Sequence, residues 1–279
     1  SYTLSAISFI MLIAVPILTM RSMAEERHSR TDQLVLTAPV SLGKMIFGKF
    51  LAMVGVFTVA VAVIAVTPLV LAAFGTVPMG ENYVAVLGFW LYGCTCIAVG
   101  MLASALTESQ VIAAVVAFAF LFLGYMMNSI TGLIGDHLIT KVLGAYDLYT
   151  PLQSFMSGCL DLTGVVYFVS VTALCLFLTC QCVQKRRWSM TTKKLTTGMF
   201  SVAMIVVGFA VAVAVNMVVK EMPSSWTAVD ATSTKLYSLT DTTKDYVKNL
   251  SQDVTIYVLS SEKSADSTLA ETLQRYEDL

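Results

Sequence analysis

Six long apolar runs constrain the fold of this 279-residue chain more than any other feature. A helix needs roughly 20 mostly apolar residues to cross about 30 Å of hydrocarbon, and each run approaches that length. In lipid the backbone must satisfy its own hydrogen bonds, and runs of this length without strict alternation argue against a closed barrel. We therefore predict transmembrane helices at Leu4–Met20, Leu51–Phe74, Tyr83–Ala105, Val111–Ile130, Val165–Val183 and Met199–Val219.

Composition supports a membrane protein. The chain is 57% hydrophobic and 13% charged, whereas a soluble domain averages about 25% charged residues. The net charge of −1 gives no bulk attraction to nucleic acid, so we expect no nucleic-acid partner. No initiating Met or basic region precedes the first run, so a signal peptide is not predicted there. We expect the chain to be a fragment of a longer protein at both ends.

The placement of basic residues predicts the orientation of the chain in the membrane. Two segments hold most of them, and short basic loops mark the cytoplasmic side. Counting spans places both segments on one side, so residues 21–49 and 184–198 are predicted to be cytoplasmic. The basic residues in question are Arg21, Arg27, Arg30, Lys44, Lys49, Lys185, Arg186, Arg187, Lys193 and Lys194.

The segments on the opposite side are less basic. The loop at 131–164 is semi-polar, and we expect a short interfacial helix there, with Tyr146, Tyr149 and Phe155 at headgroup depth. The tail at 220–279 has the pattern of a soluble α/β segment. "SLTDTTKDYVKNL" and "STLAETLQRYEDL" predict helices, and "DVTIYVL" predicts a strand. The predicted fold is an all-α polytopic membrane protein with six transmembrane helices and a partial C-terminal extracytoplasmic α/β domain.

The charged segment between the first two runs predicts a short helix and an elbow. Glu26 and Arg30 are four residues apart and can pair across one turn. Pro39 disfavours a helical residue before it, so the helix should end near Thr37. Ser41 can cap the next helix.

Two interpretations of this segment remain open. One is an interfacial helix that lies on lipid. The other is a docking helix whose apolar residues Leu34, Val35 and Leu36 enter a groove on a soluble partner. Its acidic residues favour docking, because anionic lipid repels them.

Other patterns indicate packing rather than chemistry. Cys96, Gly100 and Ser104 form a ladder of small residues four apart, which suits close helix packing and an interface between two transmembrane halves. "GKMIFGKF" at Gly43–Phe50 matches a P-loop in part, but it lacks the hydroxyl residue and the preceding strand. None of the six predicted spans holds an Asp, Glu, Lys or Arg, which counts against an ion-coupled carrier. No catalytic or metal-ligating constellation is predicted.

The charged segment also resembles a known family. "MRSMAEERHSRTDQLVLTAPVSLGKMIFGKFLA" is similar to the cytoplasmic segment of ABC-2 type transporter permeases, most of all the gliding-motility (Gld-type) permeases. Val35 departs from the pattern, because a second Leu is usual there. The matching positions are Arg21, Ala24, Glu25, Glu26, Arg27, Thr31, Leu34, Thr37, Pro39, Val40, Gly48, Lys49, Phe50 and Leu51.

The tail "VDATSTKLYSLTDTTKDYVKNLSQDVTIYVLSS" resembles the start of the Gld-type extracytoplasmic component. Together the two resemblances imply two components joined in one chain. Residues 1–184 would be the permease domain without its first helix, and 185–198 a basic cytoplasmic linker. Residues 199–219 would be an anchor helix, and 220–279 the start of the extracytoplasmic component.

The resemblance implies the permease subunit of an ATP-driven exporter in a bacterial cytoplasmic membrane. ATP and Mg²⁺ would bind a separate ATP-binding subunit and not this chain, and a second transmembrane half or second copy would complete the pore. The residues implied to couple with that subunit are Ala24, Glu25, Glu26, Arg27, Arg30, Thr31, Leu34, Val35, Leu36, Thr37 and Pro39. A non-transport scaffold that presents the tail and an ion-coupled carrier remain as alternatives.

Overall fold

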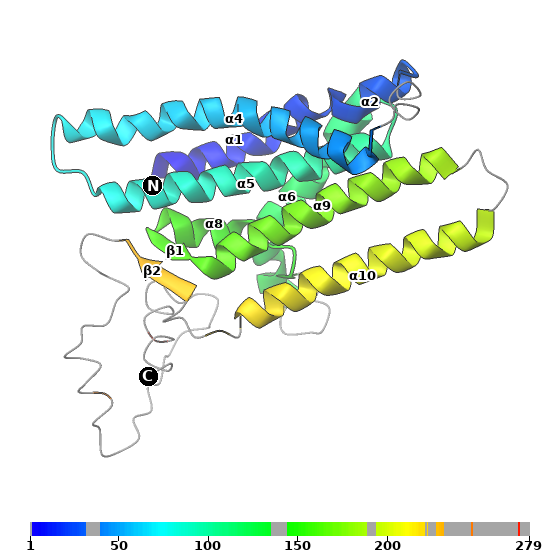
Figure 1. Ribbon diagram of the computed structural model, residues 1–279. Coiled ribbons are helices and arrows are strands. Elements are labelled where there is room, and N and C mark those ends of the chain that lie inside the picture. The colour runs from blue at the N-terminus through cyan, green and yellow to red at the C-terminus, as the bar shows by residue number, and fades with distance from the viewer. Residues whose placement is uncertain are drawn as a thin grey trace.

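The computed structural model describes residues 2–31, 40–134, 144–188, 194–220, 222, 227–231, 247 and 273. These residues are mostly helical (Figure 1). The helices are α1 (Tyr2–Thr19), α2 (Arg21–His28), α4 (Leu42–Ala72), α5 (Met79–Leu106), α6 (Gln110–Ile134), α8 (Tyr149–Met156), α9 (Leu162–Trp188) and α10 (Lys194–Lys220). The strands are β1 (Cys159–Asp161) and β2 (Ala228–Asp230).

Five of the six predicted spans are confirmed as helices long and apolar enough to cross a membrane. Their bounds are Thr3–His28, Leu42–Ala72, Met79–Leu106, Gln110–Leu133 and Leu162–Gln184. The sixth, Met199–Val219, lies within α10, but the apolar stretch described there is the shorter Ala203–Val219. A sixth span therefore stays a prediction.

Helix α5 forms the centre of the bundle. Of its most apolar stretch 78% is buried, against 22–39% for the other four spans. Glycines let its neighbours approach closely: an ideal Cβ on Gly93 would overlap the ring of Phe57 from α4, and one on Gly88 would overlap Phe155 from α8. Small residues on a membrane helix permit this kind of backbone approach. The α5 sequence therefore fits a helix surrounded by others.

Hydroxyl groups add polar contacts between the apolar helices. Thr95 Oγ1 of α5 donates to the Phe168 carbonyl of α9 at 3.2 Å and lies 3.1 Å from Thr172 Oγ1. Trp90 of α5 donates its indole N–H to Thr58 Oγ1 of α4 at 2.9 Å. Such bonds stabilise membrane helix pairs by about 0.6 kcal/mol on average.

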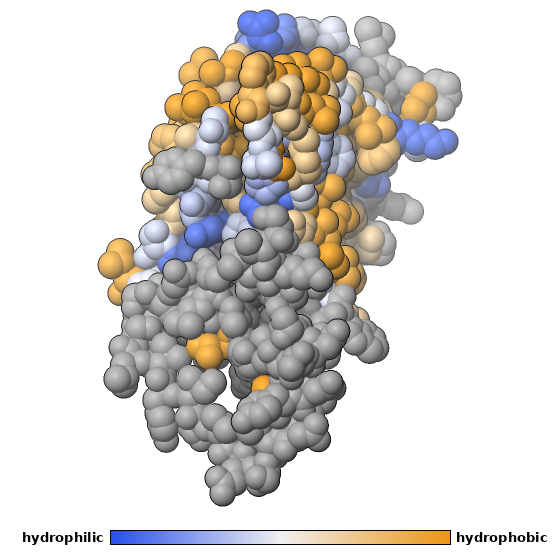
Figure 2. Space-filling view, turned by 90° about the vertical axis from the view of Figure 1, so that its left-hand side faces the viewer, coloured by the Kyte–Doolittle hydropathy of each residue, from blue (hydrophilic) through white to orange (hydrophobic). Residues whose placement is uncertain are grey.

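The outer helices expose apolar side chains, as a lipid-facing surface would. On α4, Val56, Val59 and Val63 are 63–70% exposed. Viewed from the end that carries β2, Figure 2 shows apolar atoms over much of the helical part of the surface. Apolar patches of this extent are rare on soluble monomers, so this surface suits lipid or another membrane helix.

The two ends of the bundle differ in character. Figure 1 places α2, the C-terminal end of α9 and the N-terminal end of α10 at one end, which we call the basic end. It places α8, β1 and β2 at the other, which we call the strand end. The described parts of the two basic segments therefore lie at the same end, as the span count requires. Which end faces the cytoplasm stays a prediction.

The predicted interfacial helix in the 131–164 loop corresponds to α8, but one of its residues was misplaced. Phe155 is fully buried rather than at headgroup depth. Its ring lies 6.3 Å from that of Phe168, and an ideal Cβ on Gly164 would be 2.8 Å from it. The aromatic side chain thus anchors α8 in the bundle instead of marking the lipid interface. Strand β1 follows and pairs antiparallel with β2, a sheet the sequence did not predict.

The predicted elements of the tail, at residues 238–250, 253–259 and 267–279, lie outside the described residues except for Val247 and Leu273. The α/β character of the tail is therefore untested.

Candidate functional site

The candidate site is the α1–α2 junction at the basic end. Only Met20 separates the two helices, and its backbone is helical, with φ −55° and ψ −34°. The Met20 N–H donates to the Pro16 carbonyl at 2.9 Å, as it would inside a helix. Because α2 continues α1, a displacement of α2 would pass directly into a predicted membrane span.

Helix α2 ends at His28, so the predicted end near Thr37 is wrong. Arg30 adopts φ 58°, in the left-handed region that terminates helices. The predicted pairing of Glu26 with Arg30 across one helical turn loses its geometric basis, because Arg30 lies beyond the last turn.

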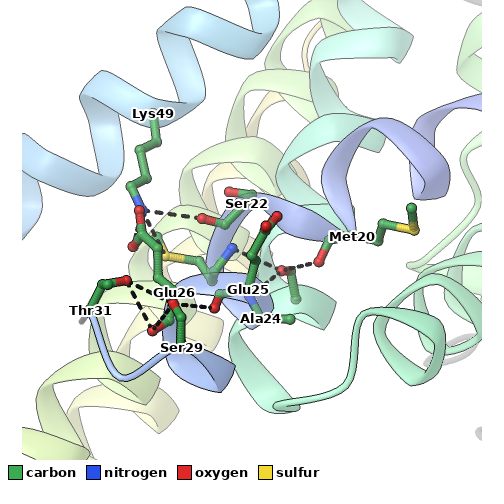
Figure 3. Close-up of polar contacts among 10 residues, drawn as sticks. Met20, Ser22, Ala24, Glu25, Glu26, Ser29, Thr31 and Lys49 are labelled. Atoms are coloured by element: carbon green, nitrogen blue, oxygen red, sulfur yellow. Dashed lines mark hydrogen bonds and ion pairs between the residues drawn. The ribbon is translucent and has the colours of Figure 1, made fainter.

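Two side-chain hydroxyls donate hydrogen bonds to carbonyl groups near the end of α2. Ser29 Oγ donates to the Glu25 carbonyl at 2.8 Å, and Thr31 Oγ1 donates to the Glu26 carbonyl at 3.3 Å. Short hydroxyl side chains compete in this way with helix continuation. Figure 3 shows both hydroxyls folded back toward the helix end. They account for a helix that stops well before Pro39.

Ser104 of α5 inserts its side chain into the junction. It is fully buried, and its Oγ accepts hydrogen bonds from the Met23 and Ala24 N–H groups at 3.0 Å each. The same hydroxyl donates to the Met20 carbonyl at 3.0 Å. In an unbroken helix the Ala24 N–H would reach that carbonyl directly. A side chain inserted into the helical ladder is a recognised cause of bending, so Ser104 defines the joint between α1 and α2.

The rest of the small-residue ladder also faces inward. An ideal Cβ on Gly100 would overlap Thr19 Oγ1 at the end of α1. Cys96 is fully buried, one turn further from the basic end. The prediction that this ladder lies between two transmembrane halves is wrong, because α1 and α2 of the same chain cover Gly100 and Ser104.

Lys49 connects the junction to α4. Its Nζ forms an ion pair with the Glu26 carboxylate and donates to the Ser22 carbonyl at 3.1 Å (Figure 3). The side chains of Lys49 and Glu26 are 23% and 33% exposed, so solvent screens this pair only in part. Glu26 thus pairs with the neighbouring span.

Arg27 connects the junction to the turn between α5 and α6. Its Nη2 lies 2.8 Å from Glu108 Oε1, and its Nη1 donates to the Leu106 carbonyl at 3.4 Å. The Arg27 side chain is 24% exposed, whereas Glu108 is 65% exposed. The inner face of α2 is therefore held by α4, α5 and the turn between α5 and α6.

The outer face of α2 is open. Arg21, Glu25 and His28 are exposed and recur at helical spacing, on the side away from the buried Met23 and Ala24. Arg21 Nε and Glu25 Oε2 are 4.0 Å apart, a surface pair that contributes little stability. A helix braced on one face and free on the other can receive a partner without losing its own supports.

The structure places only part of the predicted coupling set. Ala24, Glu25, Glu26 and Arg27 lie in α2, and Arg30 and Thr31 lie just past its end. Leu34, Val35, Leu36, Thr37 and Pro39 fall outside the described residues.

Sequence reasoning missed the part played by Glu108 and the true role of Ser104. Glu108 is the one charged residue between two apolar runs, and that isolation could have marked it. Nothing local in the sequence indicates which backbone groups Ser104 binds.

Ligand chemistry is not indicated at this site. Gly43–Phe50 is helical within α4, so it does not form the loop that a P-loop requires. Ser41 stands at the predicted N-cap position of α4, although its side chain makes no capping bond. Among the described residues, no group of three or more His, Cys, Asp or Glu side chains could hold a metal ion.

Comparison with known families gives one match. A family model described as ABC-2 family transporter protein matches residues 1–183. No curated protein and no solved structure matches the chain significantly. The matched residues cover about two thirds of the chain and include the whole α1–α2 junction with its supports.

Proposed function

Because this chain belongs to the ABC-2 family of transporter proteins and is a transmembrane transport component, we propose that it is the permease subunit of an ATP-driven exporter. A separate ATP-binding subunit supplies the hydrolysis, and this chain moves the substrate. The proposal places that subunit against α2 and the residues that follow it.

The bracing of α2 is the observation that carries the proposal. Ser104, Lys49 and Glu108 hold the inner face from α5, α4 and the α5–α6 turn. A push on α2 would therefore be shared among several helices at once. A helix that only rests on lipid needs no such set of contacts, so this geometry favours coupling.

The docking surface combines two parts. The exposed residues Arg21, Glu25 and His28 offer charge on the outer face of α2. The apolar residues Leu34, Val35 and Leu36 follow a few positions later in the sequence. A groove that accepts apolar anchors within a charged rim is a common mode of helix recognition.

The finer organisation is also proposed. The basic end faces the cytoplasm of a bacterial cell, residues 220–279 lie outside, and a second transmembrane half or second copy of this chain completes the pore. The Gld-type resemblance at residues 20–52 and 229–261 supports one chain that joins a permease with the start of an extracytoplasmic component.

The test is co-purification of the ATP-binding subunit. The protein is tagged, and membranes from cells that carry wild type, Leu34→Asp or Leu133→Asp are solubilised gently. Leu133 is 89% exposed near the end of α6 that lies away from α2, so it provides the same substitution remote from the proposed docking surface. A Walker-motif ATPase should co-purify with wild type and Leu133→Asp, and its yield should fall at least tenfold with Leu34→Asp.

Two outcomes would contradict the proposal. An ATPase that remains bound to Leu34→Asp would show that docking lies elsewhere. The absence of any ATPase from wild type would favour a scaffold or an ion-coupled carrier. A response of transport to an imposed ion gradient would then separate those two.

A further inference from the structure

In the part of helix α10 whose side chains the structure describes, residues 203–219, one stripe contacts the rest of the protein. Apart from Ile205, the residues of Ala203–Val219 that are not exposed recur every four or three positions, which places them on one helical face. Residues between them are open, with Val207 and Val211 about 55% exposed and Met217 62% exposed. The stripe consists of Met204, Gly208, Ala212, Asn216 and Val219.

The stripe packs against α9 through a close steric contact and a hydrogen bond. An ideal Cβ on Gly208 would lie 3.0 Å from the Phe177 ring, so the glycine lets that ring approach α10 closely. Asn216 Nδ2 donates to Ser170 Oγ at 2.7 Å and to the Ala212 carbonyl at 2.8 Å. A carboxamide in an apolar helix requires such partners, since lipid offers none.

A second attachment point lies at the strand end. Strand β2 pairs with β1 in the register Cys159↔Asp230, Leu160↔Val229 and Asp161↔Ala228. Beyond the strand, the Ala231 N–H donates to the Gly158 carbonyl at 3.2 Å. Since β1 follows α8 directly, β2 is attached beside the helix that Phe155 anchors in the bundle.

We propose that α10 and β2 form a two-point clamp. Through it the part of the chain that begins at α10, which we call the accessory unit, docks on the permease unit, residues 1–188, without need of a covalent link. The first point is the α9 face at Ser170 and Phe177, and the second is the edge of β1. Both parts of the clamp lie beyond residues 1–183, where the family match ends. The clamp fixes residues 227–231 to β1 beside α8, so that this segment moves with α8 and β1. It does not depend on the proposed coupling to ATP.

The test cuts the chain between the two units. A protease site is placed between Trp188 and Lys194 in the full-length protein, which is purified in mild detergent, cleaved and passed over a sizing column. The fragment that begins at α10 should co-elute with the permease fragment. Asn216→Val should reduce its retention at least threefold, and so should Ala231→Pro, which removes the N–H donor to Gly158.

A neighbouring substitution provides the control. Met217→Val also introduces valine, but at the next position, which lies on the exposed face of α10. Retention of the fragment should therefore stay at the wild-type level. The double variant Ser170→Ala/Asn216→Val should retain as much fragment as Asn216→Val alone, because both changes remove the same hydrogen bond between the two side chains. Separation of the wild-type fragments after cleavage would overturn the clamp. Equal retention of Asn216→Val and Met217→Val would also overturn it.

Discussion

One hydroxyl sets the geometry of the α1–α2 junction. Ser104 Oγ bonds three backbone groups of the neighbouring segment and is fully buried. Leaving a buried donor or acceptor unpaired costs about 1–3 kcal/mol. When the hydroxyl is removed, these groups can avoid being left unpaired in one way: the Ala24 N–H can bond the Met20 carbonyl directly if the α1–α2 junction straightens. The residue is therefore expected to control the angle of α2 as well as stability.

Ser104→Ala should uncouple the permease while leaving the ATP-binding subunit bound. The outer face of α2 is unchanged, so the pull-down yield should stay near wild type. The ATPase rate of the complex should lose its dependence on the permease, and the thermal midpoint should fall by an amount equivalent to roughly 1–3 kcal/mol. Ser104→Thr, which keeps the hydroxyl, should retain more coupling than alanine. Loss of binding in Ser104→Ala would instead assign Ser104 a purely structural role.

Arg27 and Glu108 offer a charge-swap test at the same scale. Glu108→Arg places two cations side by side, and Arg27→Glu does the same with two anions. Because Glu108 is 65% exposed, each single change should cost under about 1 kcal/mol of stability. Coupled ATPase activity should fall severalfold in each single variant and recover in the double variant. If the double variant loses as much coupled ATPase activity as the two single variants together, the pair does not transmit the motion.

At the scale of elements, sequence predicted the spans better than their arrangement. Length and apolar character identified five helices, because lipid leaves the backbone few choices. The same character could not show that α5 is central, although Gly88, Gly93 and Gly100 mark it in retrospect. Pro39 suggested where α2 should stop, but the hydroxyls of Ser29 and Thr31 act earlier.

The burial of Phe155 was missed for a related reason. An aromatic residue in a semi-polar loop fits the headgroup region. Gly88 and Gly164, which make room for Phe155, come from two other helices, and only the fold brings them together. Contacts of this kind depend on tertiary structure and are not visible in a local pattern.

Gly88→Ala tests the seat of α8 in the bundle. The added methyl would overlap Phe155, and overpacking of a core costs about 1–3 kcal/mol. The thermal midpoint of the detergent-solubilised protein should fall accordingly, and Phe155→Leu should recover part of the loss in the double variant. Gly43→Ala supplies the control, because nothing lies within 4 Å of an ideal Cβ there. Equal thermal midpoints for the two alanine variants would mean that Phe155 of α8 does not pack against Gly88.

At the scale of the whole molecule, the two ends are joined through the central helices. Helices α1, α5 and α6 each contact both α2 at the basic end and α8 at the strand end. A change in the angle of α2 therefore has a direct route to the region where β2 attaches. This route gives the proposed coupling a mechanical path through the described helices.

The orientation of the molecule can be tested by labelling from one side. Moving Lys or Arg into the membrane costs about 2.5–3.5 kcal/mol per residue at the centre of a helix, which disfavours translocation of the basic end. Phe74→Cys and Val229→Cys, at positions 87% and 61% exposed, should react with a membrane-impermeant thiol reagent in cells whose cytoplasmic membrane is intact. His28→Cys, also exposed, should react only after that membrane is permeabilised. The native cysteines are buried or half-buried, so wild type measures the background. Labelling of His28→Cys in intact cells, with protection of the other two, would reverse the orientation and place the docking surface out of reach of any cytoplasmic ATPase.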